Sequence, residues 1–471
     1  MPSRVLLISA NGYEVPYAVF PLGLAQLNAA LRAAGHETKW VDCLADHEPI
    51  ENALAEFRPD VVGVSLRNID DVAFKKRETF YGTLFELCDR IRQRSQVRII
   101  VGGSGFSIFP ERLLARCGAD FGIQGEGEAG LLELLAALET GADYRSIPGL
   151  VFHDDGIVRA NPQQPDRLER PITSDDRPDR LVEFYLSRSL MLNVQTQRGC
   201  SFECCYCTYP LIEGRHHRRR PPELVADELA QLAARGTRYV FVVDSVFNSS
   251  PTHVFETCEA ILRRGVKIQW GCFLRPQGLT AEQMNIMARA GLAHIEFGSD
   301  SFSDTVLAAY QKRLRFEDIR HAAELAAQAR VDQCHFLILG GPGETRETLD
   351  ETLVNSRRLP DSVILPIIGM RVYPGTALFR QAVAEGAIAA DTDLLEPFHY
   401  IAPGLNAEFI QRRLKEFLKT DPNWIIGEPP PSFHQLVQRL RQRGVAGPLW
   451  TYFAMLQRMA PATSAVQATM P

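Results

Sequence analysis

Two series of short apolar runs, each alternating with longer segments of helical periodicity, constrain what this chain of 471 residues can fold into. The first series lies in the N-terminal third of the chain and is rich in Val, Ile and Leu. Its runs are residues 4–10, 38–42, 61–66, 98–101 and 121–123. Strands that alternate with helices in this way predict an α/β fold with a Rossmann-like parallel sheet of five strands. Ligands of such sheets bind beyond the carboxyl ends of the strands.

The second series follows a polar, proline-rich stretch and predicts another α/β unit. Its apolar runs are residues 191–195, 239–244, 267–272, 294–299, 333–339 and 362–372. Six strands with helices between them are enough for a partial (β/α)6 barrel, with chemistry at the C-terminal strand edge. Four parts are therefore expected: a first domain over 1–140, a linker over 141–190, a barrel over 191–380, and a small helical cap closing over the barrel mouth at 381–471.

Composition and charge exclude several classes of protein. A net charge of -6 gives no electrostatic reason to expect nucleic acid as a partner. No stretch has the length and apolarity of a membrane span, and the N-terminal residues do not resemble a secretory signal. The ten cysteines form no disulfide framework. We therefore expect a cytoplasmic protein that acts on a small-molecule substrate.

Four of the ten cysteines lie in one short segment, from Cys200 to Cys207. The spacing C-x3-C-x2-C of Cys200, Cys204 and Cys207 suits three corners of a 4Fe-4S cluster. The fourth iron then has no protein ligand and can bind an external chelating molecule, as the open position of a catalytic zinc does. Because Cys205 adds a fourth thiol, a four-cysteine zinc site or ordinary core cysteines stay open as alternatives. The other six cysteines show no second spacing of this kind, so no auxiliary cluster is expected.

An aromatic residue, Tyr206, precedes the last of these cysteines. With it the segment resembles the radical S-adenosylmethionine (SAM) superfamily, whose motif is C-x3-C-x-aromatic-C. The resemblance implies that Cys200, Cys204 and Cys207 ligate the cluster while Cys205 does not. It also implies that the amine and carboxylate of SAM chelate the open iron, and that an external electron donor such as flavodoxin or ferredoxin reduces the cluster.

The loops that follow the barrel strands carry the residues that this resemblance assigns to SAM. They are Tyr206, Asp244, Asn248, Glu296, Ser299, Asp300, Gly340, Gly341 and Arg371. Each also has an ordinary structural interpretation: Asp300, for example, could cap the helix that begins near Ser303. The basic run from Arg215 to Arg220 is either a solvated loop or a group of arginine forks that bind carboxylate or phosphate.

The loops at the carboxyl edge of the first sheet are rich in glycine, which lets a backbone approach a ligand closely. This half resembles the cobalamin-binding domain found in front of many radical SAM proteins. The residues implied in cobalamin binding are Asn11, Ser65, Arg67, Asn68, Gly102, Gly103, Ser104, Gly125, Glu126 and Gly127. The string D-x-H-x-x-G, whose histidine ligates cobalt from below in other cobalamin proteins, does not occur here. No lower histidine ligand is therefore expected, and a scaffold that has lost cobalamin stays open.

The two resemblances together imply a cobalamin-dependent radical SAM enzyme that methylates an unactivated carbon of a natural product or lipid. One alternative is transfer of a 3-amino-3-carboxypropyl radical from SAM to an acceptor, as in arsinothricin-type biosynthesis. Another is a radical rearrangement or cyclisation, and a more remote one is a non-catalytic cobalamin or redox sensor. The sequence assigns no catalytic residue and no particular substrate.

Overall fold

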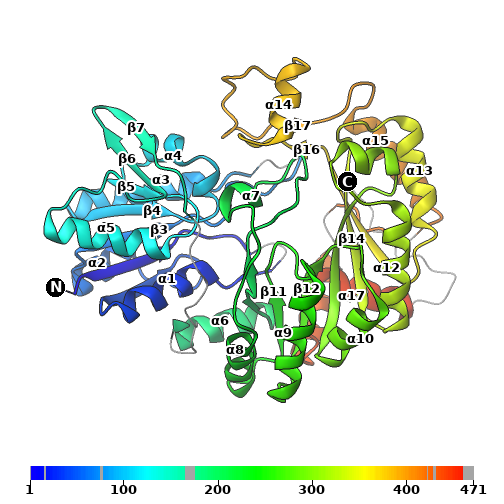
Figure 1. Ribbon diagram of the computed structural model, residues 1–471, viewed down its shortest axis with the longest axis horizontal. Coiled ribbons are helices and arrows are strands. Elements are labelled where there is room, and N and C mark those ends of the chain that lie inside the picture. Colours follow the sequence, from blue (N-terminus) through cyan, green and yellow to red (C-terminus); the bar gives the residue numbers. More distant parts are fainter. Residues whose placement is uncertain are drawn as a thin grey trace.

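The computed structural model describes residues 2–14, 17–74, 78–164, 176–421, 423–427 and 431–459. Two α/β units lie side by side, each built on its own sheet (Figure 1). The N-terminal sheet has seven strands in the order β2-β1-β3-β4-β5-β6-β7. They are β1 (Arg4–Ser9), β2 (Glu37–Asp42), β3 (Val61–Ser65), β4 (Arg98–Gly102), β5 (Phe121–Ile123), β6 (Leu150–Asp154) and β7 (Ile157–Ala160). The first five are parallel, which confirms the predicted Rossmann-like sheet.

Helices cover both faces of this sheet because neighbouring side chains of a strand point to opposite faces. Leu7 of β1 packs with residues of α1 (Leu22–Ala33) and α5 (Glu128–Thr140). Its neighbour Leu6 packs on the other side, with α2 (Ile50–Phe57), α3 (Tyr81–Arg94) and α4 (Pro110–Cys117). A short 3-10 helix, η1 (Phe106–Ile108), follows β4. Since β1 lies between β2 and β3, the connections after β1 and β3 diverge, and a ligand crevice is expected at their carboxyl ends.

The hairpin of β6 and β7 corrects the expected linker over 141–190. β6 pairs antiparallel with β5, and β7 pairs with β6, so the hairpin extends the first sheet. Asp155 and Gly156 at its tip have positive φ angles, as a tight hairpin turn requires. The sequence predicted the turn correctly but not the strand that the hairpin pairs with. Residues 165–175 of the expected linker lie outside the described residues.

The second sheet has six parallel strands in the order β15-β14-β13-β12-β11-β8, as a partial barrel requires. The strands are β8 (Leu192–Val194), β11 (Tyr239–Val242), β12 (Gln269–Leu274), β13 (Leu292–Asp300), β14 (Asp332–Leu339) and β15 (Ser362–Ile368). The helices between them are α8 (Pro222–Ala234), α9 (Pro251–Arg263), α10 (Ala281–Arg289), α11 (Asp304–Ala309), α12 (Phe316–Gln328) and α13 (Arg346–Ser356). The predicted partial (β/α)6 barrel is confirmed.

Shorter elements join these two units and complete the chain. They are α6 (Asp179–Ser189), β9 (Gln197–Arg198), α7 (Tyr209–Ile212), β10 (Arg218–Arg219), β16 (Met370–Arg371), α14 (Ala377–Ala384), β17 (His399–Tyr400), α15 (Ala407–Phe417), α16 (Pro431–Gln442) and α17 (Leu449–Met459). β9 pairs with β10, and β16 pairs with β17, both antiparallel. Among the described helices, none combines the length and the apolar composition needed to cross a membrane.

The C-terminal segment is mostly helical, as expected, but its last helix does not lie over the barrel mouth. Trp450 of α17 packs against Cys334 and Val363, which lie near the starts of β14 and β15. Ala446, just before α17, packs against Tyr239 at the start of β11. An incomplete barrel leaves the inner face of its sheet without a closing strand, so apolar inner side chains need another cover. α17 supplies that cover at the end of the barrel opposite the C-terminal strand edge.

Candidate active site

The cysteine loop runs from β9 to α7 at the C-terminal edge of the barrel. Gly199 enters it with φ +86°, and a Cβ there would lie 2.1 Å from the carbonyl oxygen of His216. Only glycine therefore fits at this point. The backbone N–H of Cys200 donates to the carbonyl of Gly214 at 3.0 Å, and that of Cys207 donates to the carbonyl of Cys204 at 3.2 Å. These contacts curl the loop so that its thiols gather on one side.

Three of the four thiols belong to this group and one does not. Burial, with a smaller contribution from the nearby thiols of Cys204 and Cys200, raises the pKa of the Cys207 thiol to about 12. Cys205 instead is 1 % exposed and packs in an apolar cluster with Val306 and Leu378. Three clustered thiols with no fourth fit a cubane with one open iron. Among the described residues no three His, Cys, Asp or Glu side chains could hold a single metal ion, so the zinc alternative gains no support.

Asp244 follows β11, where we expected a SAM contact, but it anchors the start of the cysteine loop. It accepts hydrogen bonds from the backbone N–H of Thr196 at 2.7 Å and of Gln197 at 3.1 Å, and from the Thr196 hydroxyl. Ser245 donates to the carbonyl of Gly199 at 2.8 Å. Both oxygens of Asp244 therefore have partners within the chain, and its expected contact with SAM stays a prediction. Its role is to fix the direction in which the chain enters the loop.

Two buried cations beside Cys204 were missed by sequence reasoning. Lys312 lies 2.7 Å from Asp300, which also accepts a hydrogen bond from the Tyr206 hydroxyl at 2.6 Å. Burial lowers the pKa of Lys312, but the charges of Asp300 and Cys204 outweigh it and hold the pKa above its usual value. The structure thus brings Tyr206 and Asp300 together, and the charged ammonium of Lys312 pairs with the same carboxylate. Lys312 follows a helix, whereas ligand contacts were expected after strands, so its place in the sequence did not indicate a site residue.

The second missed cation, Arg275, directly follows β12. Because ligand contacts are expected after strands, this position could have identified Arg275 as a candidate site residue. It is 8 % exposed, and its guanidinium lies 4.2 Å from the ring centre of Phe202 in the cysteine loop. Asn248 holds its backbone through a pair of hydrogen bonds, each 2.8 Å long. The side chain of Asn248 therefore positions Arg275, and its expected contact with SAM stays a prediction.

The other residues predicted for SAM separate into two groups. Ser299 is fully buried and bonded to His335 at 2.8 Å, and the backbone N–H of Gly341 donates to the Tyr310 hydroxyl at 3.1 Å. The N–H of Gly340 donates to Glu344. These groups already have partners within the barrel. Glu296, in contrast, uses one carboxylate oxygen to accept a hydrogen bond from Trp450 at 2.9 Å.

Burial gives Glu296 a testable pH dependence. It raises the pKa of this carboxyl from 4.5 to about 7. The carboxyl then loses its proton near pH 4.5 in the unfolded chain and near pH 7 in the folded chain. The free energy of unfolding therefore falls as pH rises between these values. Glu296→Gln keeps an oxygen for Trp450 and cannot ionise. We expect it to be the more stable protein at pH 8, by on the order of 3 kcal/mol, and to lose this advantage at pH 4. Unfolding measured at both pH values tests this, and an unchanged difference between the proteins contradicts it.

Arg371 was also predicted to contact SAM, and this stays a prediction, although its side chain already has partners within the chain. It pairs with Asp70 of the first unit at 2.9 Å, and both side chains are 1 % exposed. Its other nitrogens donate to the carbonyls of Val372 at 2.6 Å and Leu394 at 2.7 Å. Tyr373 donates to the same carboxylate at 3.1 Å. Arg371 is therefore a structural clamp between the barrel and the N-terminal sheet.

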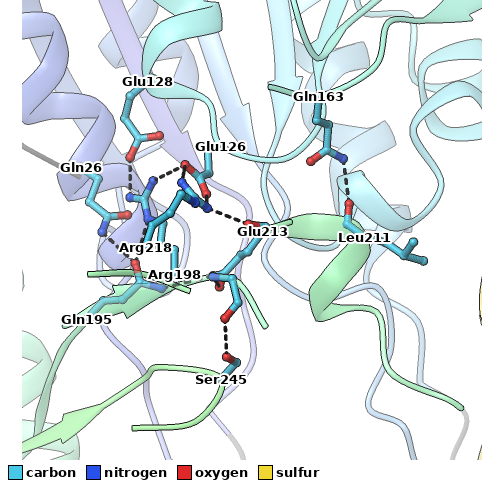
Figure 2. Close-up of polar contacts among 11 residues, drawn as sticks. Gln26, Glu126, Glu128, Gln163, Gln195, Arg198, Leu211, Glu213, Arg218 and Ser245 are labelled. Atoms are coloured by element: carbon cyan, nitrogen blue, oxygen red, sulfur yellow. Dashed lines mark hydrogen bonds and ion pairs between the residues drawn. The ribbon is translucent and has the colours of Figure 1, made fainter. Parts of the chain in front are cut away.

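A second clamp joins Arg198 and Arg218 of the barrel to Glu126 and Glu128 of the first unit (Figure 2). Arg198, two residues before Cys200, lies 2.5 Å from Glu128 and 3.2 Å from Glu126. Arg218 donates to Glu126 as well, at 2.8 Å. The Glu126 carboxylate is thus bound by two arginines of the barrel, and its expected contact with cobalamin stays a prediction. The glycine-rich loop after β5 is tied in this way to the strand that leads into the cysteine loop.

In the first sheet, the loops after β3 and β4 approach each other closely through their backbones, as expected at a ligand site. Gly103 has φ +98°, and a Cβ there would lie 2.5 Å from the carbonyl oxygen of Leu66. Ser104 donates to the carbonyl of Arg67 at 2.6 Å, which joins the loops after β3 and β4. The other predicted positions lie at the ends of β1, β3, β4 and β5: Asn11, Ser65, Asn68, Gly102, Gly125 and Gly127. Asn11 accepts a hydrogen bond from its neighbour Tyr13 at 3.3 Å.

The Arg67 side chain stands out in these loops. It has no hydrogen bond or ion pair to any residue that the structure describes, and burial lowers the pKa of its guanidinium. Tyr17 and Tyr209 lie near it, the first from the loop after β1 and the second from α7. A partly buried cation without a partner costs free energy, so a ligand is expected to complete its surroundings.

Comparison with known protein families identifies both units. Residues 194–354 match the model of the Radical SAM superfamily, and residues 8–135 match that of the B12 binding domain. The chain therefore contains a radical SAM domain preceded by a B12-binding domain. The resemblance expected from the cysteine motif and the glycine-rich loops is confirmed for both halves of this radical SAM protein. The matched families also agree with the expected cofactors, which are SAM with a 4Fe-4S cluster, and cobalamin.

Several relatives of this radical SAM protein are methyltransferases. An uncharacterized methyltransferase of Pyrococcus horikoshii is 27 % identical over 78 % of this chain and 79 % of its own. The tryptophan 2-C-methyltransferase of Streptomyces laurentii is 25 % identical over 80 % of this chain and 74 % of its own. The solved structure of the methyltransferase TsrM from Kitasatospora setae, with cobalamin and a [4Fe-4S] cluster bound, superposes with a TM-score of 0.87. It covers 98 % of both chains at 23 % identity and so establishes a shared fold.

Proposed function

We propose that the protein is a cobalamin-dependent radical SAM enzyme that methylates an unactivated carbon of a small molecule. The observation that carries this proposal is the pair of clamps: they hold the glycine-rich edge of the B12-binding sheet against the cysteine loop. Arg198 and Glu128 form one clamp, and Arg371 and Asp70 form the other. A methyl group on cobalamin and a radical generated from SAM can react only if their sites face each other across a short gap.

The residues present suit these cofactors. Cys200, Cys204 and Cys207 would ligate the cluster, and Glu296 with its open carboxylate oxygen would face SAM inside the barrel. When bound, the cofactors supply the radical and the methyl group. Lys312 and Asp300 hold fixed charges beside the cluster loop, which favours one orientation of a charged molecule there.

Arg67 would contact cobalamin from the loop after β3. A guanidinium has five N–H donors and no lone pair for a metal, so it cannot act as a lower ligand of cobalt. This agrees with the missing D-x-H-x-x-G string. Titration of the protein with cobalamin, followed by paramagnetic resonance of the cob(II)alamin form, reports the lower ligand independently of turnover.

The relatives indicate the range of substrates. Their names include tryptophan 2-C-methyltransferase, hopanoid C-3 methylase and cytidylyl-2-hydroxyethylphosphonate methyltransferase. We accordingly propose a natural product or lipid precursor as substrate. We place the enzyme in the cytoplasm with an external one-electron donor, because its ten cysteines are all free and such thiols persist in a reducing compartment.

A second candidate function is a radical cyclisation. It is favoured by the 25 % identity, over 74 % of this chain, to the anaerobic magnesium-protoporphyrin IX monomethyl ester cyclase of Cereibacter sphaeroides.

Anaerobic turnover with SAM labelled in its methyl group tests the proposal. We expect 5′-deoxyadenosine and S-adenosylhomocysteine as coproducts, with the label in the product. Label-free product with 5′-deoxyadenosine alone would indicate the cyclisation. Methylthioadenosine as the stoichiometric coproduct, with no labelled methyl in the product, would overturn methyl transfer in favour of aminocarboxypropyl transfer.

A further inference from the structure

The basic run from Arg215 to Arg220 divides into two pairs of arginines with different surroundings. Arg218 pairs with Glu126, as Figure 2 shows, and Arg220 is buried against Glu228 at 2.7 Å. Arg215 and Arg219 are exposed instead, and Arg219 donates only to the hydroxyl of Ser250. The run is therefore neither a uniform solvated loop nor a single ligand site. Among the residues that the structure describes, neither exposed arginine has an ion pair with a carboxylate.

These exposed arginines lie directly beside the cysteine loop. The backbone N–H of Cys200 donates to the carbonyl of Gly214, and the backbone N–H of Ser201 donates to the His217 ring at 3.4 Å. The segment that carries Arg215 and Arg219 therefore lies against the cysteine loop. On the other flank, Arg313 is 79 % exposed and pairs with Glu203 of the loop at 2.7 Å. The loop is thus bordered by exposed arginines on both sides.

The loop itself reaches the surface between these arginines. Ser201 and Glu203 are exposed, each next to a cysteine of the motif. Ser201 directly follows Cys200 and Glu203 directly precedes Cys204, so exposed residues flank two of the three cysteines in the sequence. Phe202 lies between them, with Arg275 over its ring. A redox protein seated on this surface would therefore come within a short distance of the cluster.

The charge of this surface is opposite to that of the whole chain. The protein carries a net charge of -6, whereas Arg215, Arg219 and Arg313 face only one exposed carboxylate, Glu203, in the loop. On its other side Arg313 lines a cavity of about 470 Å³ together with Arg315, Asp304 and Asp318, so there the positive charge is balanced by carboxylates. A local patch of this kind steers an acidic partner to one place on an acidic protein.

We propose that Arg215, Arg219 and Arg313 form the docking site for a small acidic protein that carries one electron at a time, such as flavodoxin. This inference rests on the proposed function, since it needs a cluster in the cysteine loop. One electron leaves the reduced flavin of the carrier and enters the cluster, and no bond forms or breaks. The arginines guide and orient the carrier and take no part in the reaction with SAM.

The test compares two triple variants of the full chain. The first carries Arg215→Glu, Arg219→Glu and Arg313→Glu. The matched control carries Arg98→Glu, Arg289→Glu and Arg330→Glu, which change three exposed arginines near the opposite ends of the strands. Binding of flavodoxin is measured by calorimetry at several salt concentrations. Reduction of the reconstituted cluster is followed by its visible spectrum, once with reduced flavodoxin and once with dithionite.

We expect the first variant to bind flavodoxin at least about tenfold more weakly at low salt, with a flatter salt dependence, while the control binds like the native protein. Its cluster should be reduced slowly by flavodoxin and normally by dithionite. Equal binding by the native protein and both variants would overturn the docking site. A weakening that is equally large in the control would do the same, because net charge alone would explain it. Failure of the native protein to hold a cluster would overturn the proposed function, and flavodoxin binding by the native protein and the variants would still test the docking site.

Discussion

Alanine at Cys200, Cys204 or Cys207 is expected to abolish binding of the 4Fe-4S cluster, whereas Cys205→Ala is expected to retain it. Three thiolates hold three corners of a cubane, so the loss of one leaves two irons without protein ligands. Cys205 faces an apolar cluster, and its backbone N–H donates to the carbonyl of Tyr310 at 3.0 Å whatever its side chain. Iron and sulfide are counted after anaerobic reconstitution of each variant. A variant at Cys205 that loses the cluster, with another single variant keeping it, would contradict the assignment.

The Cys205 variant also provides a check on folding. Replacing a buried thiol by a methyl group leaves a small cavity, and its cost should resemble that of other modest core truncations. Cys258→Ala is a matched control, since Cys258 is equally buried in another apolar cluster. Both variants should keep the native iron content and lose similar stability.

Asp70→Asn is expected to destabilise the protein by about 3–5 kcal/mol, because it leaves the buried guanidinium of Arg371 without a counter-charge. The change is nearly isosteric and keeps the oxygen that accepts from the backbone N–H of Val72 at 3.0 Å. Unfolding in denaturant, with hydrogen exchange of residues 370–402, measures the loss. The control is Asp421→Asn, whose partner Arg357 is 51 % exposed, and it should cost less than about 1 kcal/mol.

A second variant separates the charge from the packing of this clamp. Adding Arg371→Met to Asp70→Asn removes the unpaired cation and should recover much of the lost stability, because replacing a buried ion pair by apolar groups is often neutral. Equal losses for Asp70→Asn and Asp421→Asn would show that Arg371 finds another partner or water. They would contradict the role of this pair as a clamp.

The sequence predicted the architecture because strand and helix periodicity are local properties. β1 to β5 and the six barrel strands follow from runs of apolar residues with turns between them. The pairing of the hairpin did not follow, since its turn at Asp155 and Gly156 specifies a hairpin without specifying its neighbour. The cysteine motif was found for the same reason as the strands: its spacing is contained within eight residues.

Polar residues at strand ends were harder to assign. Asp244, Glu126 and Arg371 stand where ligand contacts are expected, yet each is bound by a residue distant in sequence. Arg371 and Asp70, for example, are 301 positions apart. Periodicity does not specify such pairings, and a carboxylate that is free for a ligand has the same sequence signal as one that is paired. Lys312 was missed because a helix, rather than a strand, delivers it to the site.

The position of α17 has a consequence for the order in which the molecule is made. Domains form as the ribosome releases them, starting from the N-terminus. The six barrel strands are released well before Trp450, so their inner face stays open to water until the last part of the chain arrives. During that interval Glu296 still lacks the indole that hydrogen-bonds to it. A chaperone that binds apolar surface would therefore find the inner face of the barrel sheet exposed until α17 covers it.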